Sequence, residues 1–166
     1  MYPYKLLHDY KKQATIQSNA YKYSEGFYRS LHKWLTYPII LLSAVSTILS
    51  GFNINHYSIM SISFSTLVLV GFERAINPKD KEQKSCQIKI EMNEIASNIK
   101  QFILNNHRTE EEIKQYTQLI HEQINIWNSI APPIQDMYIT KSTNKYAERT
   151  RKHKQEYNTH SGSSLC

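Results

Sequence analysis

The chain has 166 residues, a formal net charge of +6 and a mean hydropathy of −0.54. This length corresponds to about one domain, and the polar average taken alone suggests a soluble protein. The charges are segregated, however, because all 20 basic and 14 acidic residues lie outside the stretch from Trp34 to Phe72. The N-terminal segment is charged and has no apolar stretch, which argues against a cleavable signal peptide.

Residues 1–33 are polar and rich in tyrosine, and they predict an N-terminal amphipathic helix. One face of this helix carries residues at steps of three and four, namely Tyr21, Ser24, Tyr28, Leu31 and Leu35. Trp34 and Tyr37 follow, where aromatic rings favour a membrane interface. Pro38 either lies in the first turn of the next helix or kinks a continuous one.

Residues 34–72 predict two membrane-spanning helices joined as a hairpin. One span needs about 20 apolar residues, and this uncharged stretch is about twice that length. Gly51, Asn53 and Asn55 supply turn-forming residues at its centre. A buried hairpin in a soluble protein is the alternative, which the many serines and threonines keep open. A chain this short has little else with which to cover two uncharged helices.

Basic residues flank the uncharged stretch on both sides, and its central turn has none. The flanking cations are Lys22, Arg29, Lys33, Arg74, Lys79 and Lys81. Because cytoplasmic segments carry the excess of positive charge, both termini are expected in the cytosol. Arg74 marks the interface at the end of the second span, as Trp34 and Tyr37 do at the start of the first. The predicted localisation is therefore a membrane that the chain crosses twice.

Small residues recur at steps of three and four in both predicted spans, a spacing that lets helices approach closely in lipid. They are Ser43, Ser46, Thr47, Ser50, Gly51, Ser61 and Ser65. Two interpretations remain open. Either these residues pack helix against helix, with hydroxyls bonded to carbonyls four residues earlier, or they line a water-filled pore. Two spans cannot enclose a water path alone, so both interpretations predict a homo-oligomer.

Residues 81–131 predict an antiparallel pair of cytosolic helices. The first carries an apolar face formed by Ile88, Met92, Ile95, Ile99, Phe102 and Ile103. After a break near Asn105, Thr109 and Glu112 have the spacing of a capping box for the second helix. The apolar face of that helix is formed by Ile113, Tyr116, Ile120, Ile124 and Trp127. We take four of these, Ile113, Tyr116, Ile120 and Trp127, as candidates for binding a partner protein.

Residues 140–166 form a basic tail that its polar composition predicts to be largely disordered. Between Lys141 and Lys154 six cations face one acid, Glu148. Such a segment can bind anionic lipid weakly or bind nucleic acid through phosphates, or it can remain solvated.

No catalytic constellation is present, so the chain is expected not to be an enzyme and to need no cofactor or metal. His121-Glu122 resembles the start of a zinc-protease motif, but Asn125 stands where its second histidine is required. There is no Gly-rich phosphate loop and no nucleophile elbow. Cys86 and Cys166 have no metal-binding spacing and are expected to be free thiols.

The order of these features resembles the SLATT-type proteins with two transmembrane helices, found as bacterial effector modules and in large DNA viruses. The resemblance covers Ala20 to Ile139 and includes the tyrosine-rich entry helix with His32, the span YPIILLSAVSTILSG, the segment FERAINPKDKEQ, and the closing stretch Trp127 to Ile134. It implies an all-α membrane module, and in the bacterial members a pore-forming effector that works with nucleotide-sensing or nucleotide-synthesising partners.

Two functions follow as expectations. The first is a homo-oligomer that forms a pore or perturbs a membrane, as the resemblance implies. The second is a structural or anchoring protein whose cytosolic helices bind a partner, for example beneath a viral shell. The bias towards Lys, Ile, Asn and Tyr suits an AT-rich genome, so a host or virion membrane is expected if the source is viral.

Overall fold

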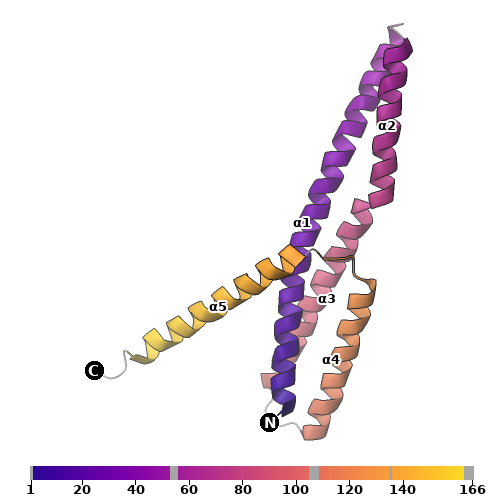
Figure 1. Cartoon of the computed structure of the whole chain (residues 1–166). Helices are drawn as coiled ribbons and strands as arrows, with labels where there is room; N and C mark the ends of the chain where they lie inside the picture. Colours follow the sequence, from indigo (N-terminus) through magenta and orange to yellow (C-terminus); the bar gives the residue numbers. More distant parts are fainter. Residues whose placement is uncertain (1, 53–55, 105–108, 135, 163–166) are drawn as a thin grey trace. The chain divides into compact units, whose positions relative to one another are not determined.

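The computed structural model describes residues 2–52, 56–104, 109–134 and 136–162. In these residues the chain is all-helical, with no strand, which confirms the predicted all-α class. Figure 1 shows the five described helices, which are α1 (Tyr2–Gly51), α2 (His56–Ile76), α3 (Pro78–Leu104), α4 (Glu110–Ile130) and α5 (Asp136–Gly162). They fall into two compact units, one comprising Met1–Ser24 with Ser85–Cys166 and the other Glu25–Lys84.

The N-terminal helix and the first apolar span are one continuous helix, α1, with Pro38 in its interior. Of the two interpretations of Pro38, the structure has the continuous helix rather than a new helix that begins there. The predicted turn after Gly51 falls largely on residues 53–55, which lie outside the described residues.

The chain leaves the second apolar helix through a break at Asn77, as the Asn-Pro pair predicts. Asn77 has a φ of 46°, and its N–H donates to the carbonyl of Glu73 at 2.8 Å. The following proline disfavours a helical conformation at this position, and asparagine tolerates the left-handed region better than most residues. Pro78 then begins α3, three residues before the predicted start, because proline suits the first position of a helix.

Helix α4 has the predicted capping box. The Thr109 hydroxyl accepts from the N–H of Glu112 at 3.3 Å, and the Glu112 carboxylate accepts from the N–H of Thr109 at 3.0 Å. Glu110, Glu111 and Glu112 occupy the first turn, where the helix dipole favours negative charge. The helix ends at Ile130, immediately before the predicted Ala-Pro-Pro stop.

The core of the first unit contains the apolar faces predicted for α3 and α4, together with one contribution that was not predicted. Its buried side chains from α3 and α4 include Ile88, Met92, Ile95, Ile99, Phe102, Ile113, Ile120 and Ile124. Leu7, Ala14 and Tyr21 of α1 belong to the same core cluster and follow one another at seven-residue steps. This spacing keeps them on one stripe of a helix that packs against others. The core is therefore built from three helices rather than from the predicted pair.

Helix α5 covers the segment predicted to be a largely disordered tail, and this prediction was wrong for residues 140–162. Side chains near the start of the helix pack against the rest of the unit. The ring of Tyr138 stacks on Tyr23 of α1 with centroids 6.2 Å apart, and Ser142 is fully buried. Residues 163–166, including Cys166, lie outside the described residues.

Candidate functional site

The unit Glu25–Lys84 holds the two helices that are long and apolar enough to cross a membrane. These helices are the C-terminal part of α1 and the helix α2. In neither helix is the most apolar stretch buried inside the structure. Their exposed side chains are large as well as apolar, with Leu41 65%, Phe64 67% and Leu67 67% exposed. Exposed apolar surface of this extent marks contact with a membrane or another protein.

A seam of partly buried residues joins the two apolar helices. Along each helix these residues recur at alternating steps of three and four, as Leu35, Ile39, Leu42, Ser46 and Leu49 in α1 and Ile59, Ile62, Thr66, Leu69 and Glu73 in α2. This is the heptad spacing of closely packed helices. Two hydrogen bonds cross between the helices, Ser46 Oγ with Ser63 Oγ at 3.3 Å and Thr36 Oγ1 to Glu73 Oε1 at 3.0 Å.

Most of the small residues predicted to pack or to line a pore lie outside this seam. Ser46 is partly buried in it, whereas the other six, Ser43, Thr47, Ser50, Gly51, Ser61 and Ser65, are exposed. Three of their hydroxyls bond within their own helix, because Thr47, Ser50 and Ser65 each donate to the carbonyl four residues earlier at 2.9–3.0 Å. Packing of α1 against α2 within one chain therefore leaves most of these small residues exposed for contact with lipid, water or another chain.

A cluster of polar residues lies where the uncharged stretch ends. Glu73 accepts from Thr36 and lies 3.2 Å from Nδ1 of His32. Two turns before Thr36 in α1, Arg29 bridges Glu25 and Glu82 at 2.8 Å each. The sequence analysis did not identify Glu73 as a seam residue. Its position four residues after Leu69, which continues the three- and four-residue spacing of the seam, was the available signal. The predicted interface residues Trp34, Tyr37 and Arg74 are all exposed at the ends of the apolar stretches.

The four residues predicted to bind a partner are used inside the chain instead. Ile113 and Ile120 are 3% and 2% exposed in the core. Tyr116 stacks on Phe102 with centroids 3.9 Å apart, and Trp127 packs against the same core. The pattern of a single helix shows that a face is apolar but does not show what covers it. The missing cover was the N-terminal part of α1.

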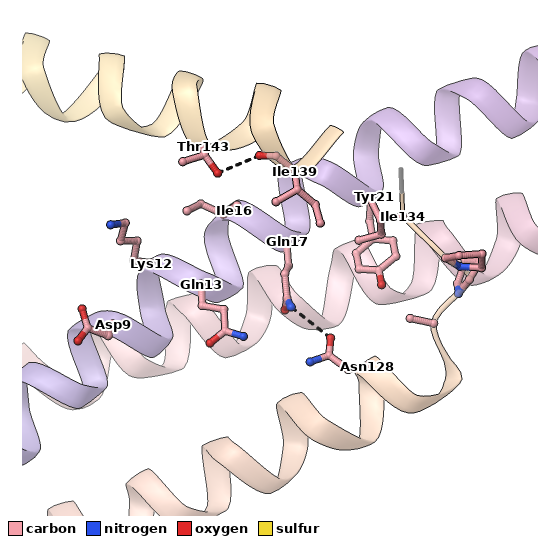
Figure 2. A pocket seen from close by; sticks show the side chains of 13 residues that line it. Asp9, Lys12, Gln13, Ile16, Gln17, Tyr21, Asn128, Ile134, Ile139 and Thr143 are labelled. Atoms are coloured by element: carbon pink, nitrogen blue, oxygen red, sulfur yellow. Dashed lines mark hydrogen bonds between the residues drawn. The ribbon is translucent and has the colours of Figure 1, made fainter. Parts of the chain in front are cut away.

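The first unit also contains an open pocket of about 700 Å³, between α1, the end of α4 and the start of α5 (Figure 2). Its lining includes Asp9 and Lys12 at one end and the carboxamides of Gln13, Gln17 and Asn128 in the middle. The side-chain nitrogen of Gln17 donates to Asn128 Oδ1 at 3.2 Å, while its buried Oε1 has no hydrogen-bond partner among the described residues. No sequence motif pointed to this pocket, because its lining comes from three separated segments.

Burial raises the pKa of Tyr21, which lines the pocket, to about 12. The phenol therefore stays protonated to a higher pH than that of an exposed tyrosine. In the described part of the chain no three His, Cys, Asp or Glu side chains gather in a way that would hold a metal ion.

The cations of α5 are partly engaged by the chain itself. Lys141 Nζ lies 4.6 Å from the centre of the Tyr23 ring, and Lys145 Nζ lies 6.0 Å from it. Lys152 pairs with Glu148 at 3.0 Å, and its hydrogen bond holds the pKa of that carboxyl below its usual value. The predicted basic segment thus offers fewer free charges than its composition suggests.

Comparison of the chain with protein-family models, with curated proteins and with solved structures finds no match.

Proposed function

We propose that this chain is an integral membrane protein that self-associates in the bilayer and opens a polar path through it. In this proposal the ends of α1 and α2 form a transmembrane hairpin, with α3 and α4 as an antiparallel pair in the cytosol and both termini on that side. Two uncharged helices with large exposed apolar side chains support the membrane placement. The basic residues on both flanks and the uncharged turn support the orientation.

The main support for self-association is that two rows of small residues, one on α1 and one on α2, lie outside the seam and are exposed. At about 100° per residue, Ser43, Thr47 and Ser50 lie roughly a quarter turn from the seam of α1 in one sense. Ser61 and Ser65 lie roughly a quarter turn from the seam of α2 in the opposite sense. In an antiparallel hairpin, opposite senses place the two rows on opposite faces.

Each face of this hairpin then combines a row of small residues with a row of large ones. The face with Ser43 and Thr47 also carries Met60 and Leu67 of α2, and the face with Ser61 carries Leu41 and Ile48 of α1. Large side chains of one copy can therefore fill the space above small residues of the next. Because both faces are usable, contacts can extend beyond a dimer, and they close into a ring if the rotation allows. A ring is the assembly in which serine hydroxyls can meet water. The resemblance to SLATT-type pore-forming modules favours the same function.

An anchoring role is the second candidate, and it rests on the outer face of α4. Leu119, Ile126 and Ile130 are 49%, 60% and 54% exposed there, at helical spacing. A partner protein could cover these residues, although it could not reach Ile113 and Ile120, which are buried in the core. In this role the hairpin only holds the cytosolic helices at a membrane, which would be a host or virion membrane if the protein is viral.

Reconstitution in lipid nanodiscs and liposomes tests the proposal. The expected result is an oligomer larger than a dimer and the release of an encapsulated dye. Ser43→Leu combined with Ser61→Leu should lower the oligomeric state by filling both rows, whereas Val45→Leu, on the large-residue side of α1, should not. A protein that inserts and oligomerises but leaves vesicles sealed would contradict the pore and favour the anchor.

A second pair of variants separates packing from a pore. Ser43→Ala with Thr47→Val keeps the side chains small and removes only their hydroxyls. Oligomers should persist in this double variant, because close approach depends on size. Dye release should fall if the hydroxyls line a water path. Unchanged release would assign the row to packing alone.

A further inference from the structure

We propose that a groove on α1, at the cytosolic end of the first span, binds an anionic phospholipid. The groove has a volume of about 620 Å³ and is lined by Ser30, Lys33, Trp34, Tyr37, Pro38 and Leu41. These residues lie on one helix face, at steps of three and one. The inference rests on the membrane placement proposed above.

The polar end of the groove matches a phosphate headgroup. Lys33 is the last charged residue before the uncharged stretch, and Ser30 lies one turn before it. Lys33 is exposed and forms no ion pair with any other described residue. Arg29, one turn earlier, is instead bridged to Glu25 and Glu82. The groove therefore offers an ammonium group and a hydroxyl to an anion at the depth where headgroups lie.

The rest of the groove matches the glycerol backbone and the upper acyl chain. Trp34 and Tyr37 are 77% and 65% exposed, and amphipathic rings of this kind favour the headgroup boundary. Pro38 and Leu41 follow on the same face, and Leu41 lies about 12 Å along the helix from Lys33. A ligand that contacts the whole groove needs a negative charge at one end and a hydrocarbon chain at the other. A phospholipid with a net negative headgroup has both, whereas a zwitterionic one brings its own cation close to Lys33.

Fluorescence of Trp34 provides a direct test, because this residue lines the groove and Trp127 is the only other tryptophan. The full chain carrying Trp127→Phe is reconstituted with phosphatidylglycerol or phosphatidylcholine brominated in the upper acyl chain, each diluted in unlabelled phosphatidylcholine. Brominated phosphatidylglycerol should quench Trp34 more than its mole fraction predicts. Native mass spectrometry of the wild-type chain, counting retained lipids, gives a second measurement without the Trp127 substitution.

Lys33→Gln should lower the relative affinity for phosphatidylglycerol about fivefold, the effect of one cation beside an anionic headgroup. Lys22→Gln is the matched control, because Lys22 is also exposed on α1 and lies about three turns before Lys33, and it should leave the preference unchanged. Equal quenching by the two lipids, or a preference that survives Lys33→Gln, would overturn the inference while leaving the membrane placement intact. Quenching by neither lipid would remove the membrane placement itself and the inference with it.

Discussion

Replacing Ile120 with alanine should strongly destabilise the unit formed by Met1–Ser24 and Ser85–Cys166. The side chain of Ile120 is 2% exposed and lies in the core built from α1, α3 and α4. Removing three carbons from such a site leaves a cavity, and substitutions of this kind cost about 2–5 kcal/mol. Alanine has the higher helix propensity, which offsets only a few tenths of a kcal/mol. A unit of about this size loses about 4–8 °C per kcal/mol, so the melting midpoint should fall by at least about 8 °C.

The neighbouring Leu119→Ala is the matched control, because Leu119 is 49% exposed on the same helix. Its effect should stay within about 0.5 kcal/mol. Thermal unfolding of the full chain in detergent, followed by far-ultraviolet circular dichroism, measures both variants. If Ile120→Ala melts like the wild type but loses capture of a partner protein, the assignment of this face to the core is refuted. That result would instead support the expectation that this face of α4 binds a partner protein.

Three further predictions concern the same unit. Thr109→Ala removes the capping box of α4 and should cost about 1 kcal/mol in the same melting experiment, whereas Thr109→Ser should cost much less. Tyr23→Leu removes the ring that holds Tyr138 and Lys141, so amide exchange over residues 137–146 should accelerate while that of α3 stays unchanged. Ultraviolet titration should find one phenol ionising near pH 12, absent in Tyr21→Phe. Because burial raises this pKa in the folded state, the stability linked to Tyr21 should be complete below about pH 10 and lost as the pH rises towards 12.

Much of the helix pattern could be predicted because its signals are local. The Asn77-Pro78 break, the Thr109–Glu112 capping box and the apolar face beginning at Ile88 each depend on residues within a few turns. Such features need only backbone sterics, one reciprocal pair of hydrogen bonds or a periodicity of 3.6 residues. The uncharged stretch is equally local, and it yields two long apolar helices in the structure.

The tertiary contacts could not be predicted in the same way, because they join distant segments. Leu7 and Ala14 gave no strong pattern of their own, yet they supply the third wall of the core. Tyr23 orders α5 through a partner more than 100 positions away, a contact that composition alone could not show. Likewise, the regular spacing of small residues identified the serines of the spans. Only the structure shows that Ser46 lies in the seam while the nearby Ser43 is exposed.

These assignments make the two units separately testable. The apolar face of α4 is buried in the core of its own unit, so this unit does not need a second copy to bury Ile113 or Ile120. The exposed rows that could join copies lie instead on the apolar helices, where Ser43 and Ser61 are outside the seam. Substitutions in separate regions with no shared partners have additive effects on stability. Filling the serine rows should therefore change the proposed assembly and leave the melting of the unit that contains Ile120 unchanged. Coupled losses of both would mean that the copies also meet through α4, on the face where Leu119 is exposed.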